Sequence, residues 1–346
     1  MPHKIVSRAL VFLSTTLALA VALAAQSTPR ESLLTLSKHD HTLAIVDPVS
    51  LKVLAKIPIG DDPHEVIASS DGKTAWVSNY GGGGRGALHT LAVVDLINQK
   101  PLAPIDLGAM RGPHGLDFAG GKVWFTAEAA KAFGSVDPAS GKVDLIIGTG
   151  QNRTHMIYVA QDLSRIFTTN ITSATVSIFE KVTPRMSSGP TGSPPAPEWN
   201  QTIVNVGAGD EGFDITPEGR ELWTANSQDG TISIINIADK RVVQTLAANV
   251  RGANRLKFTP DGKLVFVSTL GGPDVVVFDA GGRKEIKRIP VGHGAAGIQM
   301  QLDGSRAFVA CTPDNYVVAI DLKSLSVAAH IDAGGNPDGL AWAVQH

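Results

Sequence analysis

The sequence predicts an all-β protein folded as a seven-bladed β-propeller of four-stranded blades. Three observations lead to this prediction: a phrase that recurs about every 42 residues, apolar strand patterns after each copy, and chain ends that supply complementary parts of one unit. Four-stranded units with this period are typical of propellers, in which each blade buries its faces against its neighbours. Helical solenoids are disfavoured because no window shows a sustained helical period of apolar residues.

The recurring phrase marks a turn between two strands. It reads SSDGKTAWVSN at 69–79, TPEGRELWTAN at 216–226, TPDGKLVFVST at 259–269 and QLDGSRAFVAC at 301–311. Eroded versions stand at 119–128, AGGKVWFTAE, and at 161–170, QDLSRIFTTN. Alternating apolar residues predict strands, and the Asp-Gly pairs predict tight hairpin turns.

Two further extended segments follow each phrase. The first is an apolar strand that often ends in Asp, as in LAVVD at 91–95 and VVAID at 317–321. The second is exemplified by KPLAPIDLG at 100–108 and RVVQTLAA at 241–248. Each unit therefore contains four strands.

One position near the start of each innermost strand is equivalent in all units. Its occupants are His64, His114, His155, Glu211, Asn254, Ala296 and Asp338. The spacing is lengthened by two insertions, at 81–89 and in the Pro/Ser/Gly-rich segment 183–199. We expect the second insertion to be a loop without structure of its own.

The two ends of the chain complete the count of blades. Residues 334–346 supply only an innermost strand, whereas residues 33–60 supply only the other three strands. Together they form a seventh blade within a single domain, 30–346. This pairing matters because a ring left open at one blade would expose unpaired strand edges.

The N-terminus predicts export to the periplasm or secretion. Residues 1–25 read as a signal peptide, with Lys4 and Arg8 before a short apolar run and an A-x-A site at Ala22-Leu23-Ala24. The run is too short for a retained anchor, so we expect no transmembrane segment in the mature chain.

Composition excludes some classes of partner. The formal net charge is −2, and removing Lys4 and Arg8 with the signal peptide makes it −4. A mildly acidic chain has no electrostatic footprint for nucleic acid. Cys311 is the single cysteine, so no intrachain disulfide forms.

The equivalent positions predict a ligand site at the channel mouth. Innermost strands surround the central channel, and convergent polar groups in a concavity are the default site hypothesis. The predicted ligand-binding residues are His64, His114, His155, Glu211, Asn254 and Asp338, with Arg111, Arg153 and Arg251 closely preceding three of them. We expect a small molecule, a glycan or a protein to bind at this face.

Part of this set suits a metal ion. Imidazoles with a carboxylate, here His114, His155 and Glu211, bind Zn²⁺ or Cu²⁺, whereas Asn, Asp and Glu alone suit Ca²⁺ or Mg²⁺. The alternative is that Pro-His-Gly is a repeated turn whose imidazole bonds a neighbouring blade. His39-Asp40-His41 is a second, weaker metal candidate.

The units resemble the YVTN-type seven-bladed propeller repeat family, through KTAWVSN at 73–79, LAVVDL at 91–96 and the Asp-Gly turns. The resemblance runs from about Leu33 to the end of the chain. It implies the propeller fold, but the family includes surface proteins, binding modules and enzymes, so the fold does not specify the function.

Two function classes follow. The first is an exported binding module with a His/Glu/Asn/Asp-rich channel mouth. The second is a metal-dependent enzyme of the lactonase or lyase type: Glu211, Asn254 and Asp338 match in type the cation ligands of similar lactonases. His114, His155 and Glu211 match in type those of streptogramin B lyase, which uses Mg²⁺. A copper site like that of the nitrous oxide reductase propeller is a third possibility.

Overall fold

The computed structural model describes residues 27–81, 87–183 and 198–346. The expected signal peptide and most of the insertion at 183–199 lie outside the described residues, as do residues 82–86. Within the described part of the chain, no helix is both long enough and apolar enough to cross a membrane.

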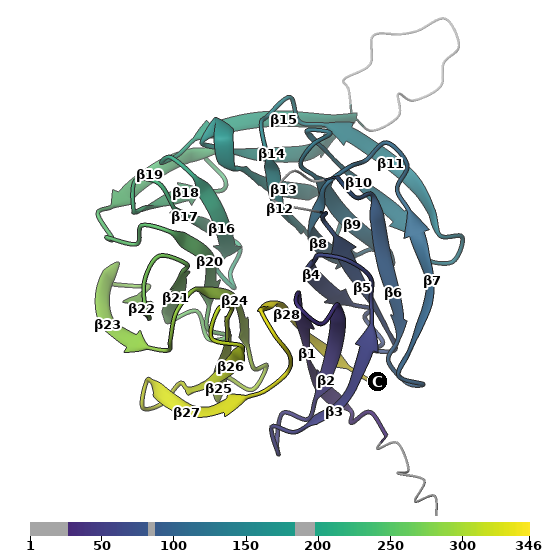
Figure 1. The fold of residues 1–346 in the computed structure, drawn as a ribbon. Helices are drawn as coiled ribbons and strands as arrows, with labels where there is room; N and C mark the ends of the chain where they lie inside the picture. The colour runs from purple at the N-terminus through teal and green to yellow at the C-terminus, as the bar shows by residue number, and fades with distance from the viewer. Residues whose placement is uncertain (1–26, 82–86, 184–197) are drawn as a thin grey trace, which may run out of the picture.

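Seven four-stranded antiparallel sheets form a ring around a central channel, as the sequence predicts (Figure 1). The first blade consists of β4 (Pro63–Ala68), β5 (Thr74–Asn79), β6 (Thr90–Asp95) and β7 (Lys100–Asp106). The second consists of β8 (Pro113–Ala119), β9 (Lys122–Ala127), β10 (Ala132–Asp137) and β11 (Lys142–Gly148). The third consists of β12 (Thr154–Val159), β13 (Arg165–Asn170), the short 3₁₀ helix η1 (Ile171–Ser173), β14 (Thr175–Val182) and β15 (Glu198–Asn205).

The remaining blades repeat this plan. The fourth consists of β16 (Asp210–Ile215), β17 (Glu221–Asn226), β18 (Thr231–Asn236) and β19 (Arg241–Leu246). The fifth consists of β20 (Ala253–Phe258), β21 (Leu264–Thr269), β22 (Asp274–Asp279) and β23 (Lys284–Pro290). The sixth consists of β24 (Ala295–Met300), β25 (Arg306–Cys311), β26 (Tyr316–Asp321) and β27 (Ser326–Ile331).

The seventh blade joins the two ends of the chain, which confirms the predicted closure. Its strand order is β28 (Pro337–Val344), β1 (Glu31–Ser37), β2 (Thr42–Val46) and β3 (Val53–Pro58). The antiparallel register pairs Leu33 with Trp342 and Leu34 with Ala341. One boundary differs from the prediction: Glu198 and Trp199, expected in the insertion, are the first residues of β15, because they continue its pairing with β14.

The hydrophobic core lies between neighbouring blades. Leu34 and Ile45 of the seventh blade, for example, share one buried cluster with Val66 and Val77 of the first. The middle strands of each blade are buried on both faces, whereas the outer strand β11 alternates exposed and half-buried residues. Stability therefore comes from packing around the ring.

The innermost strands approach closely because several have glycine at their third position. A Cβ added at Gly115 would lie 2.6 Å from the His155 carbonyl oxygen, and one at Gly339 would clash with that of His64. Gly212 and Gly297 are equally close to the next strand. This approach positions the residues that line the channel mouth.

Candidate metal site at the channel mouth

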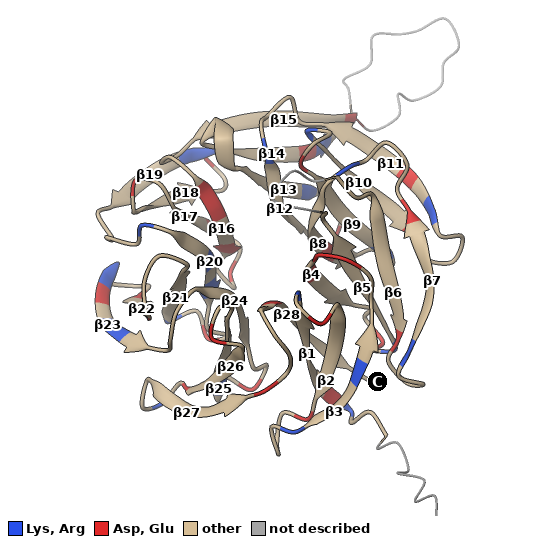
Figure 2. Cartoon of the chain, in the orientation of Figure 1, with Lys and Arg blue, Asp and Glu red and all other residues tan. Residues whose placement is uncertain are grey.

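The seven equivalent positions are the second residues of the seven innermost strands. The structure has His64, His114 and His155 inside β4, β8 and β12, because each strand begins one residue earlier. Figure 2 shows acidic segments on β16 beside the channel, where Glu211 is the second residue.

His114 and His155 lie together in the mouth. Their ring centroids are 3.9 Å apart, and the residues are 4% and 3% exposed. Thr126 helps to hold the two strands together: its hydroxyl donates to the His155 carbonyl at 2.6 Å and accepts from Gly115 N–H at 2.9 Å.

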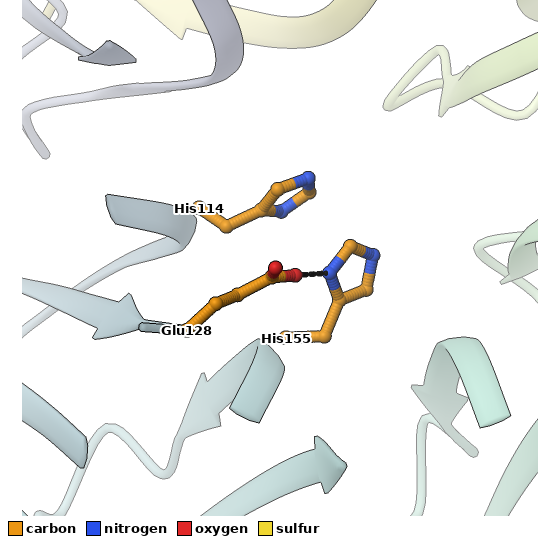
Figure 3. A group of neighbouring side chains, drawn as sticks. All are labelled: His114, Glu128 and His155. Atoms are coloured by element: carbon orange, nitrogen blue, oxygen red, sulfur yellow. Dashed lines mark hydrogen bonds and ion pairs between the residues drawn. The ribbon is translucent and has the colours of Figure 1, made fainter. Parts of the chain in front are cut away.

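Glu128, just after β9, is the third member of this cluster (Figure 3). His155 Nδ1 lies 2.5 Å from Glu128 Oε1. The other oxygen, Oε2, accepts from the Tyr80 hydroxyl at 2.5 Å and from Arg153 Nε at 3.3 Å. One ligand atom from each of His114, Glu128 and His155 can be chosen so that all three lie within 4.8 Å of one another, a compact donor set for a metal ion.

His155 lies between two carboxylates. Its Nε2 is 3.1 Å from Glu211 Oε2, within ion-pair range but without hydrogen-bond alignment. Burial alone would lower the pKa of His155, but the charge of Glu211 and the hydrogen bond to Glu128 outweigh it and raise this pKa to about 9. Burial works against ionisation of Glu128 too, yet its hydrogen bond with His155 brings the pKa of Glu128 down to about 2.

His114 has a different environment. Its Nδ1 is buried and has no hydrogen-bond partner within the described residues. Burial, helped by the charge of His155, holds the pKa of His114 well below its usual range. A neutral imidazole with a free nitrogen is the form that binds metal ions.

Two other ring residues, His64 and Asp338, belong to a separate network. His64 Nε2 lies 3.0 Å from Asp62 Oδ1, and His64 Nδ1 lies 3.3 Å from Lys38 Nζ. Lys38 is ion-paired with Asp338 at 2.6 Å. Asn254 Oδ1 is buried and has no partner within the described residues. The network borders the cluster, since the His64 and His114 ring centroids are 5.0 Å apart.

The three arginines do not act alike. Arg153 reaches Glu128, whereas Arg111 Nη1 donates to the Ala87 carbonyl and Arg251 Nη1 to the Gln228 carbonyl. Arg111 and Arg251 therefore connect surface loops.

His39 and His41, the second metal candidate, do not share a site. His39 Nδ1 lies 2.8 Å from Asp40 Oδ1, and His41 Nδ1 lies 3.2 Å from Asp61 Oδ1, so the two rings have different carboxylate neighbours.

Sequence reasoning did not assign Glu128 and Tyr80 to the cluster. In three blades the second strand ends in Asn79, Asn170 or Asn226, but the strand register makes Ala127, not Glu128, their equivalent in the second blade, so the repeat gave no signal for Glu128. Tyr80 follows one of these asparagines and carries no repeat signal.

The sequence profile of the cytochrome D1 heme domain family matches residues 87–299. No curated protein sequence matches the chain significantly. A functionally unknown protein from Desulfotomaculum acetoxidans DSM 771 is structurally similar, with a TM-score of 0.72, 16% identity, and coverage of 90% of this chain and 98% of that chain.

Two further solved structures share the fold. A putative 6-phosphogluconolactonase from Bacteroides fragilis NCTC 9343 has a TM-score of 0.69 and 15% identity, over 92% of this chain and 99% of that chain. Dihydro-heme d1 dehydrogenase NirN, solved in complex with DHE, has a TM-score of 0.61 and 16% identity, over 88% of this chain and 64% of that chain. At these identities the similarity concerns the fold alone. Because the family profile spans more than half of the chain, this propeller belongs to the cytochrome D1 heme domain family.

Proposed function

We propose that this protein is an exported metal-binding propeller, which holds a divalent transition metal ion at the channel mouth through His114, Glu128 and His155. The observation that carries the proposal is the convergence of three buried donor groups, one of which includes a nitrogen without a partner. Two imidazoles and one carboxylate suit Zn²⁺ or Cu²⁺ better than Ca²⁺ or Mg²⁺.

The surroundings of the cluster support this assignment. Tyr80 and Arg153 both bind Glu128 Oε2, which leaves Oε1 directed at His155. Glu211 faces the far nitrogen of His155. Histidine ligands commonly direct their second nitrogen at a carboxylate, which orients the ring. In this proposal Glu211, a ligand candidate by sequence, orients His155, and Glu128 takes the ligand position. Binding of the ion then requires loss of the proton that His155 Nδ1 shares with Glu128 Oε1.

Heme, which the family name implies, does not fit the residues at this mouth. A heme iron bound by histidine needs a ring nitrogen that faces space for a flat macrocycle. Here the His114 ring lies 3.9 Å from that of His155 and 5.0 Å from that of His64, and Tyr80 packs at 5.5 Å. The imidazoles pack against other rings, so the donors suit a single ion.

A metal-dependent enzyme of the lactonase or lyase type is the second candidate. The buried Asn254 Oδ1 favours it, because an unpartnered amide oxygen is a ligand for hard cations such as Ca²⁺ or Mg²⁺. Against it, Asp338 is paired with Lys38 and Glu211 faces His155, so these two carboxylates already have partners. In such an enzyme the ion would polarise a carbonyl group as a Lewis acid.

Elemental analysis of untagged protein tests the proposal. We expect about one equivalent of zinc or copper in the wild type, loss of it in His114→Ala/His155→Ala and in Glu128→Gln, and retention in His293→Ala. His293 is the matched control, an exposed histidine paired with Asp314. Near-ultraviolet circular dichroism checks that the variants are folded.

Three results would overturn it. The first is protein that stays free of metal and gains no thermal stability from added Zn²⁺ or Cu²⁺, because a ligand bound to the folded state must raise its stability. The second is one equivalent of Ca²⁺ or Mg²⁺, with lactone hydrolysis, which would favour the enzyme. The third is a Soret absorption band with one heme per chain.

A further inference from the structure

The channel has a second compartment below the mouth. At the third position of the innermost strands, Glu65 of β4 and Arg255 of β20 form an ion pair across the channel. Their side chains are 12% and 7% exposed, and Arg255 Nη1 also donates to the Asn254 carbonyl at 3.0 Å. This pair separates the mouth from the lower channel.

The lower channel contains a cavity of about 260 Å³. Residues at the fifth position of the innermost strands line it: Ile67, Asp117, Tyr158, Asp214, Lys257 and Gln299. Tyr158 is 38% exposed, so the cavity wall extends to the solvent. A concavity in which a few polar groups converge beside apolar and aromatic side chains is the default candidate for a small-molecule site.

Two carboxylates in this wall have the same structural role in different blades. Asp117 accepts Phe118 N–H at 2.7 Å and, from the next blade, Val159 N–H at 2.6 Å. Asp214 accepts Ile215 N–H at 3.0 Å and, from the next blade, Phe258 N–H at 2.9 Å. The two sites therefore form a matched pair within one molecule.

The two sites differ in whether a cation lies beside the carboxylate. In the blade that follows Asp214, the fifth residue of the innermost strand is Lys257, whose Nζ lies 3.7 Å from Asp214 Oδ1. In the blade that follows Asp117, the fifth residue of the innermost strand is Tyr158, and Asp117 forms no ion pair within the described residues. Burial raises the pKa of Asp117 to about 6, although its backbone hydrogen bonds and the more distant charge of Lys257 oppose this, so it is ionised at neutral pH. A half-buried carboxylate that forms no ion pair is costly.

We propose that the lower channel binds a small organic monocation, a primary ammonium with an apolar body. At Asp117 the ligand's ammonium takes the role that the lysine ammonium has at Asp214. The apolar body packs against the Tyr158 ring and the wall formed by Ile67 and Phe213. An aromatic ring beside a carboxylate suits a cation, because the ring face attracts positive charge. This site is independent of the proposed metal site.

Calorimetric titration of the mature protein with 2-phenylethylammonium at pH 7.5 tests this site, with phenylacetate as its anionic counterpart. We expect saturable binding of the ammonium and none of phenylacetate.

Asp117→Asn should weaken binding at least about tenfold, which is about 1.4 kcal/mol, and Tyr158→Leu should weaken it less. Asp214→Asn, the matched control, keeps Asp117 and should bind the ammonium more tightly than Asp117→Asn does. His114→Ala/His155→Ala should bind like the wild type, so that failure here is distinct from failure of the metal site.

The proposal fails if phenylacetate binds as well as the ammonium, or if folded Asp117→Asn binds the ammonium like the wild type. It also fails if phenylalanine binds more tightly than 2-phenylethylammonium, since that result would make Lys257 part of a site for zwitterions. Thermal melting of each variant confirms that it is folded.

Discussion

At the scale of single residues, the metal cluster depends on a glycine. Gly115 lets β8 approach β12 so closely that a Cβ would lie 2.6 Å from the His155 carbonyl oxygen and 2.7 Å from Met156 Cα. Both contacts are with backbone, which cannot rotate away. The same approach places the His114 ring against the His155 ring.

Gly115→Ala should therefore destabilise the protein and separate the two rings. We expect a loss of about 1–3 kcal/mol in the free energy of unfolding, as overpacking usually costs, together with weaker metal binding. Urea denaturation measures the first effect. Gly148→Ala is the control, because a Cβ there meets nothing within 4 Å. Equal stability of the two variants would contradict the close-approach argument.

Asp117 should make stability depend on pH. Its pKa is about 6 in the folded chain against 3.8 in a free carboxyl, so the folded state binds this proton more tightly. The contribution of Asp117 is therefore most favourable below about pH 4 and is lost as pH rises to about 6, by up to about 3 kcal/mol. Asp117→Asn should lack this contribution to the change of the free energy of unfolding with pH. Urea denaturation of both proteins at intervals between pH 4 and 7.5 measures it, and identical slopes would contradict the prediction.

At the scale of elements, each blade depends on neighbours that are distant in sequence. β28 pairs with β1, and its residues Leu340 and Trp342 share a buried cluster with Phe308 of the sixth blade. Removing β28 would expose the edge of β1 and leave the ring without an innermost strand.

Deletion of residues 334–346 should abolish cooperative unfolding or leave the protein insoluble. The reason is that both the pairing with β1 and the packing between blades are lost together. Deleting only His346, an exposed residue, is the control and should leave thermal melting unchanged. A truncated protein that melts like the wild type would show that the ring does not need this closure.

At the scale of the whole molecule, the channel has three levels. A polar ring forms the mouth, the Glu65–Arg255 pair crosses the middle, and a half-buried cavity lies below. The ion pair joins strands of the first and fifth blades, 190 residues apart, so it connects opposite parts of the ring.

Breaking this pair on one side should be strongly destabilising. Glu65→Leu leaves the Arg255 guanidinium buried without its counter-charge, at a cost of about 3–5 kcal/mol. Glu65→Leu/Arg255→Met should recover much of that loss, because two apolar side chains need no charge compensation. A double-mutant cycle from chemical denaturation gives the coupling between the two residues. Additive losses would contradict direct pairing.

Parts of the candidate site were predictable, and parts were not. The repeat identified His114 and His155 as equivalent residues, because a fixed period in sequence becomes a fixed place in a ring. It did not show that Glu128, which follows β9 in the blade of His114, reaches His155 in the next blade while Glu211 faces the other nitrogen of His155. Side-chain length and rotamer decide such contacts, and neither is visible in a repeat. Arg111 and Arg251 likewise precede ring positions yet bind loop carbonyls.

The sequence by itself determined the propeller, its seven blades and the blade shared by the two chain ends, because strand periodicity and turn residues are local signals that the ring repeats. Only the tertiary structure decided which polar residues meet in the channel. It brought Glu65 to Arg255, left Asp117 without a cation and gathered His114, Glu128 and His155. These contacts depend on how closely neighbouring backbones approach and on which side chains fill the channel, and both are properties of the closed ring.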